Sequence, residues 1–127
     1  MTEPFYVMSN PAKQKGTAME TMVTDYLIAQ GFMHAHRTPL KGGGDTGDIH
    51  GIMNKTGRRV AIQVKNQKRF NLSGWLDDTV EQARRLGNAF PALIVKRPGK
   101  GKSNLGDTYV VLRLSDLVDI LKEAQYS

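Results

Sequence analysis

The sequence predicts a single α/β domain in which helices flank a central mixed sheet, and three observations support this fold class. The chain has 127 residues, enough for one hydrophobic core and short for two. Its hydrophobic fraction of 39% and charged fraction of 24% are typical of globular proteins. Segments with apolar residues at helical spacing alternate with β-branched runs, in the order helix, three strands, helix, two strands, helix.

The N-terminal segment shows no sustained periodicity. Residues 1–16 contain Pro4 and Pro11, so we expect an arm there and assign the folded domain to residues 17–127. The first helix is expected over residues 17–31, where apolar residues recur at helical intervals and a glycine ends the pattern.

Three strands are expected next, over residues 32–40, 48–53 and 58–66. The glycine-rich segment KGGGDTG, residues 41–47, connects the first strand to the second. The segment NKTG, residues 54–57, has the composition of a turn, so the second and third strands should form a hairpin.

A second helix is expected over residues 71–88, with Ser73 as its cap and Trp75 as a core anchor. Ser115 should cap a C-terminal helix. The remaining assignments are a strand over 89–96, a basic loop over 97–107, a strand over 108–114 and a last helix ending near 124.

The third strand carries polar residues inside an apolar run. Alternate residues of a strand face opposite sides, so Val60, Ile62 and Val64 should form one apolar face. Gln63 and Lys65 then share the other face. That face should border a polar cleft, because burying an unpaired ammonium costs several kcal/mol.

The hairpin should bring Asp48 toward this polar face. The Asp48 carboxylate, the Gln63 amide oxygen and the Val64 carbonyl are the kind of oxygen ligands that Mg²⁺ prefers. Lys65 could orient or deprotonate a metal-bound water, or balance charge that develops at phosphorus. The set therefore predicts hydrolysis of a phosphodiester.

This arrangement resembles a known family. Asp48 followed by Gln63-Val64-Lys65 is similar to the D…(D/E/Q)xK motif of the PD-(D/E)XK nuclease superfamily, which implies a restriction-endonuclease-like core of order αβββαβ. The resemblance covers Lys15 to Val95. Within this superfamily the chain looks most like archaeal-type Holliday junction resolvases. The segments that carry this resemblance are KGTAMETMVTDYLIAQGF, HAHRTPLKGGGDTGDI, VAIQVKN and EQARRL.

The resemblance implies further roles. Glu20 matches an acidic residue that assists metal binding from the first helix, and Gln82 matches a Gln that faces the active site. It also implies a Mg²⁺ cofactor for which Mn²⁺ can substitute. The sequence departs from the family pattern at Gln63, where Glu is usual, and at Gly47, where Pro is usual.

The charge balance favours a polyanionic partner. Lys and Arg number 18 against 12 Asp and Glu, which gives a net charge of +6. No recognition-helix pattern is present, so we expect DNA shape to be recognised more than sequence. The residues assigned to nucleic-acid binding are Lys13, Lys15, Arg37, Lys41, Lys68, Arg69, Gln82, Lys100 and Lys102.

Each candidate also has a structural interpretation. Thr17 and Glu20 fit a capping box, and Lys65 could simply extend from a strand end to water. Gln63 could be a cross-strand hydrogen-bonding residue, and Gln82 a solvated helical side chain. The chain's three histidines lack acidic or thiol partners at matching spacing, so zinc is not expected.

The function expected from these observations is a Mg²⁺-dependent, structure-selective DNA endonuclease, a Holliday junction resolvase that makes paired nicks. The near two-fold symmetry of a four-way junction implies a homodimer. Two alternatives stay open: a restriction-like or repair nuclease acting on duplex ends or flaps, and a non-catalytic DNA-binding module. The chain has no bilayer-spanning apolar run and no signal-peptide pattern, so we expect a cytoplasmic location in a prokaryote or a phage-infected cell.

Overall fold

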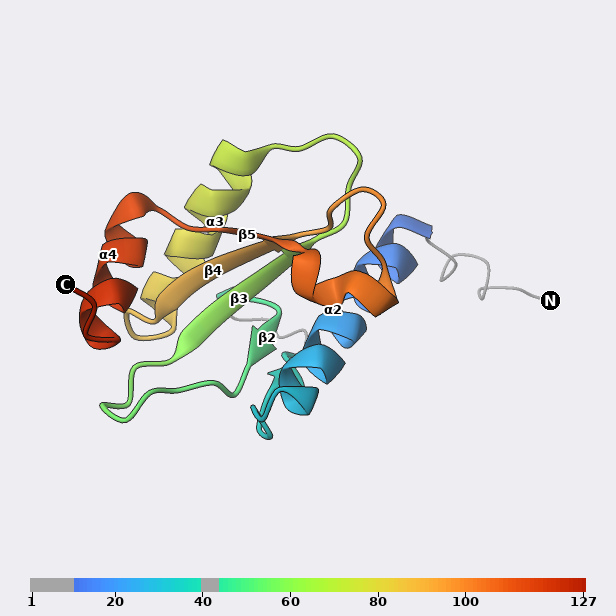
Figure 1. The fold of residues 1–127 in the computed structure, drawn as a ribbon. Helices are drawn as coiled ribbons and strands as arrows, with labels where there is room; N and C mark the ends of the chain where they lie inside the picture. The colour runs from blue at the N-terminus through green and yellow to red at the C-terminus, as the bar shows by residue number, and fades with distance from the viewer. Residues whose placement is uncertain (1–10, 40–43) are drawn as a thin grey trace.

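A computed structural model describes residues 11–39 and 44–127. Within these ranges the fold is α/β, with a five-stranded mixed sheet between helices, in agreement with the predicted class (Figure 1). The elements are α2 (Pro11–Ala29), β1 (His36–Arg37), β2 (Ile49–His50), β3 (Val60–Lys65), α3 (Leu72–Arg85), β4 (Phe90–Val95), the 3₁₀ helix η1 (Lys102–Asp107), β5 (Tyr109–Val111) and α4 (Leu114–Glu123).

The sheet has the spatial order β1-β2-β3-β4-β5. Neighbouring strands are antiparallel except β3 and β4, which run parallel from the pair Val60–Phe90 to the pair Lys65–Val95. Parallel neighbours need a crossover, and α3 supplies it. β3 is therefore central, with β2 on one side and β4 on the other.

The predicted hairpin is confirmed. Ile49 pairs with Ile62, and the turn is closed by the Asn54 side chain. Its Oδ1 accepts hydrogen bonds from the amides of Thr56 and Arg58 at 3.0 and 2.9 Å, and from the Thr56 hydroxyl at 2.8 Å. This register places Asp48 opposite the segment that contains Gln63.

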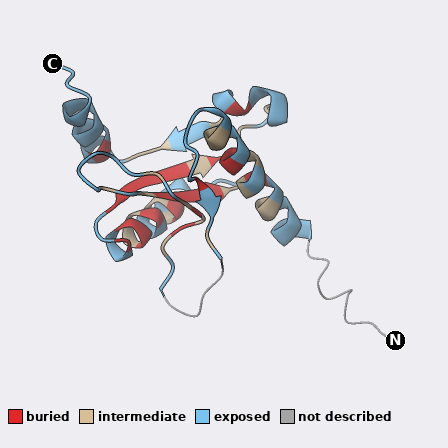
Figure 2. Cartoon of the chain, turned by 90° about the horizontal axis from the view of Figure 1, so that it is seen from below, coloured by how far each residue is buried: buried red, intermediate tan, exposed pale blue. Residues whose placement is uncertain are grey.

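The predicted alternation along β3 is also confirmed. Ile62 and Val64 pack in one cluster with Met19 of α2, whereas Ala61 packs with Ala83 of α3. The two helices thus cover opposite faces of the sheet, and buried residues concentrate in the central strands (Figure 2). Trp75 is buried against β4, as predicted for a core anchor.

The N-terminal boundary differs from the prediction. α2 begins at Pro11, so residues 11–16 belong to the helix and not to an arm. Proline is tolerated in the first helical turn, where its missing N–H has no helical partner. Thr17 consequently lies inside the helix, and the capping-box interpretation of Glu20 is wrong. The rest of the predicted arm, residues 1–10, lies outside the described residues.

Both predicted serine caps are wrong. Asn71 caps α3, because its side chain accepts a hydrogen bond from the Gly74 amide at 3.2 Å. α4 begins one residue before Ser115, and Arg113 occupies the cap position without a side-chain cap bond. The loop predicted over residues 97–107 contains the short helix η1.

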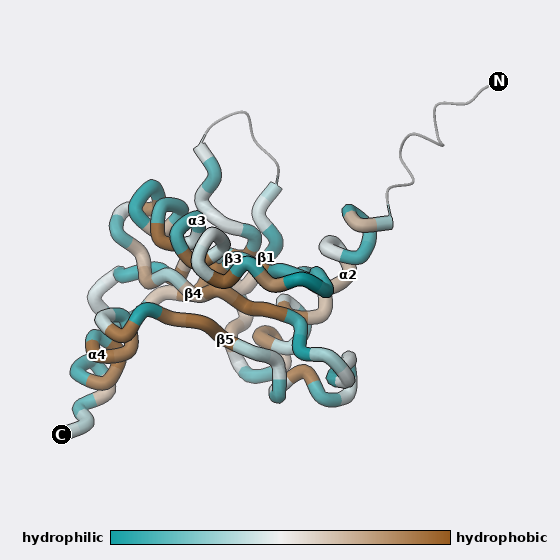
Figure 3. The backbone as a smooth tube through the Cα atoms, turned by 90° about the horizontal axis from the view of Figure 1, so that it is seen from above, coloured by the Kyte–Doolittle hydropathy of each residue, from teal (hydrophilic) through white to brown (hydrophobic). Residues whose placement is uncertain are grey.

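The C-terminal helix α4 lies at one end of the sheet and carries much apolar surface (Figure 3). Its exposed large apolar side chains are Leu114, Leu117, Val118, Ile120 and Leu121. Arg58 of the hairpin forms ion pairs with Asp119 and Glu123 of this helix. Across the described part of the chain, no helix has both the length and the apolar character needed to cross a bilayer.

Candidate active site

A cavity of about 530 Å³ lies between α2 and the C-terminal end of β3. The structure brings to it all the residues that the sequence assigns to catalysis and metal binding, which come from α2, the residue before β2, and β3. They are Glu20, Asp48, Gln63, Val64 and Lys65. Lys15 and Lys68 line the same cavity, so cationic side chains border the carboxylates.

Asp48 is fixed by the edge of β3. Its amide donates to the Ile62 carbonyl at 2.7 Å, and its Oδ2 accepts a hydrogen bond from the Val64 amide at 2.8 Å. The N–H and C=O of one strand residue point to the same side, so the Val64 carbonyl also faces the Asp48 edge. Main-chain geometry therefore places a carboxylate and a carbonyl oxygen beside each other.

The pKa of Asp48 is raised from its ordinary value of 3.8 to about 6. Burial is the main cause, and the negative charges of Glu20 and Asp45 add to it. The Val64 hydrogen bond and the charge of Lys65 act in the opposite direction. A carboxylate that is costly to ionise in this environment gains by pairing with a cation.

Gln63 supplies a second candidate oxygen ligand, and this oxygen has no hydrogen-bond partner among the described residues. Its side chain is only 8% exposed, and its Oε1 accepts no hydrogen bond from the described residues. Such a buried acceptor costs about 1–3 kcal/mol. Coordination of a cation would satisfy it, so the set of Asp48, Gln63 and Val64 oxygens fits a hard divalent ion such as Mg²⁺.

Carboxylates and imidazoles alone do not make a metal site here. Within residues 11–39 and 44–127, no group of three or more His, Asp or Glu side chains is arranged to hold an ion. A metal in the cavity would depend on amide, main-chain and water oxygens as well as on Asp48.

Lys65 lies on the cavity wall beside Trp75. Its Nζ is 5.8 Å from the centroid of the indole ring, within range of a cation–π interaction. Among the described residues Lys65 forms no ion pair. The ammonium is therefore oriented by an aromatic face while its charge stays available to a ligand in the cavity.

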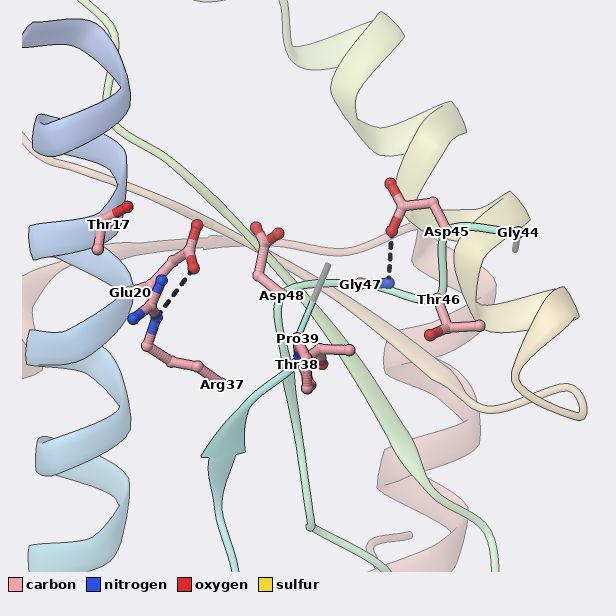
Figure 4. A pocket seen from close by; sticks show the side chains of 10 residues that line it. All are labelled: Thr17, Glu20, Arg37, Thr38, Pro39, Gly44, Asp45, Thr46, Gly47 and Asp48. Carbon is pink, nitrogen blue, oxygen red and sulfur yellow. Dashed lines mark hydrogen bonds and ion pairs between the residues drawn. The ribbon is translucent and has the colours of Figure 1, made fainter. Parts of the chain in front are cut away.

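Glu20 and Asp48 also border a second cavity, of about 320 Å³. Figure 4 shows this cavity, with the Glu20 side chain extending from α2 toward the segment that carries Asp48. Glu20 is paired there with Arg37 of β1, whose Nε lies 3.2 Å from Glu20 Oε1.

Asp45 is a site residue that the sequence analysis missed. It lines the second cavity, and its Oδ1 accepts a hydrogen bond from the Gly47 amide at 2.9 Å. Its Oδ2 accepts one from Gln82 Nε2, also at 2.9 Å. The signal was present in the sequence, because Asp-x-Gly is typical of a turn closed by its own side chain.

Gln82 approaches the second cavity only through its hydrogen bond to Asp45. It is 4% exposed, lines neither cavity and contacts Asp45. A side chain this buried is a poor candidate for direct DNA contact, and it is not a solvated helical Gln either. Gln82 instead holds the loop that precedes Asp48.

The predicted basic surface is only partly assembled around the two cavities. Arg37 lines the second cavity, and Lys15 and Lys68 line the first. Lys100 pairs with Asp107 at 3.7 Å and lies in neither cavity. The other predicted DNA-binding cations are Lys13, Arg69 and Lys102, which are exposed outside both cavities, and Lys41, which lies outside the described residues.

Comparison of the chain with models of known protein families gives no match, and comparison with curated proteins gives none either.

Proposed function

We propose that this protein is a Mg²⁺-dependent DNA endonuclease, and that its substrate is a four-way junction cut by paired nicks. The observation that carries the proposal is the convergence of Glu20, Asp48, Gln63 and Lys65 on one cavity. These residues come from separate parts of the chain, and packing of a core does not require that combination. An oxygen-rich site beside the Lys65 ammonium, which forms no ion pair within the described residues, suits phosphodiester hydrolysis.

The order of elements supports the same proposal. The described chain runs α2, β1, β2, β3, α3, β4, which is the order expected for a restriction-endonuclease-like core. Asp48 immediately precedes the second strand, and Gln63 and Lys65 lie near the end of the third.

The roles of the residues follow from their positions. Asp48, Gln63 and the Val64 carbonyl would hold Mg²⁺, with Glu20 assisting. These residues would hold an ion that would supply positive charge for the phosphate and a more acidic water. Lys65 orients the attacking water or donates to the phosphate as negative charge builds up on its oxygens. Lys15 and Lys68 hold the DNA backbone at the cavity rim.

A homodimer belongs to this proposal, because two opposed strands of a symmetric junction need two active sites. Action on intracellular DNA agrees with the expected prokaryotic or phage-infected cytoplasm.

A second candidate function is a DNA-binding module without catalysis. Gln63 favours it, because an amide brings no charge to the metal where a carboxylate would. The retention of Lys65 beside Asp48 favours the enzyme, since binding alone does not need an ammonium inside the cavity.

Strand cleavage distinguishes these functions. An end-labelled four-way junction and its matched linear duplex are incubated with Mg²⁺ or with EDTA. The wild type is compared with Lys65→Ala and with Lys55→Ala, which removes one exposed charge from the hairpin turn outside both cavities. We expect symmetric, Mg²⁺-dependent nicks near the junction, reduced about 10²–10⁴-fold in Lys65→Ala and retained in Lys55→Ala.

Equal cleavage of both DNAs would instead indicate a general or restriction-like nuclease. Tight junction binding without cleavage under any metal condition would establish the binding module and remove the enzyme proposal.

A further inference from the structure

Arg37 lines the second cavity and is paired with a residue that borders both cavities, Glu20. Its Nε donates a hydrogen bond to Glu20 (Figure 4). The bond to Glu20 uses one of the five N–H donors of the guanidinium. The Arg37 and Glu20 side chains are 42% and 21% exposed, so solvent weakens the pair.

Building on the proposed nuclease function, we propose that the second cavity is a subsite for a DNA phosphate next to the scissile one. When DNA binds, Arg37 passes from Glu20 to this phosphate, and Glu20 becomes free to assist the metal ion. In the DNA-free protein the same pair holds Glu20 away from the metal.

The cavity has the chemistry of a phosphate subsite. A guanidinium can bind phosphate through two parallel hydrogen bonds, which are stronger than a partly exposed ion pair. Thr38 lines the same cavity, and its Oγ1 is buried with no hydrogen-bond partner among the described residues, so its hydroxyl would gain a hydrogen bond by turning toward a bound phosphate. The volume of about 320 Å³ is at the lower end of the range for small-ligand sites.

Electrostatic repulsion at the site explains why Arg37 would pair with Glu20 in the DNA-free protein. Glu20 and Asp48 border the same two cavities, and their negative charges oppose each other. Without a cation, Arg37 relieves part of this repulsion. A metal ion and Arg37 therefore compete for Glu20, whereas a phosphate and Glu20 compete for Arg37. Binding of DNA and binding of metal should consequently reinforce each other.

The competition is tested by Mn²⁺ binding without DNA, measured from the electron paramagnetic resonance signal of free Mn²⁺. The proteins are the wild type, Arg37→Ala, Glu20→Gln and the double variant, which form a double-mutant cycle. We expect Arg37→Ala to bind Mn²⁺ about twofold to fivefold more tightly than the wild type. In this variant the ion no longer has to displace Arg37 from Glu20, and the gain corresponds to the free energy of a partly exposed ion pair. This gain should vanish in the Glu20→Gln background. Lys55→Ala controls for the loss of one positive charge elsewhere.

The phosphate contact is tested separately, by junction binding in EDTA at several salt concentrations. Arg37→Ala should lower the log–log salt slope by about one, and Lys55→Ala should leave it unchanged.

Four results would overturn the inference: no Mn²⁺ binding by the wild type, unchanged or weaker Mn²⁺ binding in Arg37→Ala, a gain that persists with Glu20→Gln, or an unchanged salt slope. Neither measurement requires cleavage, so a wild type that binds Mn²⁺ and DNA but does not cut would contradict the proposed function alone.

Discussion

Asp48 links the stability of the protein to pH. Its pKa is about 6 in the folded protein against 3.8 ordinarily, so the folded state favours the neutral form. The stability gained by protonation is fully present below about pH 4 and is lost as the pH rises through about 6. Asp48→Asn is neutral at every pH. We expect it to exceed the wild type by about 2–3 kcal/mol in free energy of unfolding at pH 7.5, and by little at pH 4.

Urea unfolding in EDTA measures this difference. Asp78→Asn, which changes an exposed carboxylate on α3, controls for the loss of one negative charge. Addition of Mg²⁺ at pH 7.5 should stabilise the wild type more than Asp48→Asn, because a ligand that binds only the folded state stabilises it. A gap between Asp48→Asn and the wild type that stays constant with pH would contradict the raised pKa.

At the scale of single residues, the sequence could predict the orientation of side chains that local periodicity determines. Alternation with a period of two puts Gln63 and Lys65 on one side of a strand whatever surrounds it. The pair of Glu20 and Arg37 could not be predicted in this way, because it joins a helix to a strand across a packed interface. The catalytic roles of these residues stay predictions.

Among the elements, the packing of β1 against β2 depends on a glycine. Gly51 follows β2 with φ of +99°, and a Cβ added there would lie 1.9 Å from the His34 carbonyl oxygen. We expect Gly51→Ala to lower the free energy of unfolding by about 2 kcal/mol or more, since the conformation and the main-chain clash both oppose it. Urea denaturation at constant pH checks this value.

Gly16→Ala is the matched control. Gly16 lies inside α2, and a Cβ there would meet nothing within 4 Å. Alanine at this helical position should raise the free energy of unfolding by about 0.5–1 kcal/mol. Destabilisation by both variants, or by neither, would contradict the local geometry described for Gly51.

Sequence patterns predicted which elements exist better than where they begin. Periodicity averages over a whole helix or strand, whereas a boundary depends on one or two side chains. Pro11 illustrates the ambiguity, because a proline both interrupts irregular segments and opens helices. Asn71 and Ser73 are both good caps two residues apart, and in the structure the Asn71 side chain accepts the hydrogen bond from the Gly74 amide.

For the molecule as a whole, the order of elements was enough to predict a layered α/β fold. Two strands joined by a helix tend to lie parallel with that helix on one face, as β3, α3 and β4 do. The cavities were less predictable, since they depend on how the glycine-rich connection approaches α3 through Asp45 and Arg85. The distribution of charge over the surface was predicted only in part, because Lys100 pairs with Asp107.

The net charge of +6 leads to a last prediction about DNA binding. If about four to six cations contact phosphates, the log–log slope of affinity against salt should be about −4 to −5. Affinity should then fall about 10²–10³-fold between 50 and 200 mM salt, as measured by fluorescence anisotropy in EDTA. Counterion release does not depend on DNA shape, so a junction and its matched duplex should give similar slopes. Recognition of shape would appear as tighter junction binding at every salt concentration, and equal affinities would argue against the four-way junction as the preferred partner.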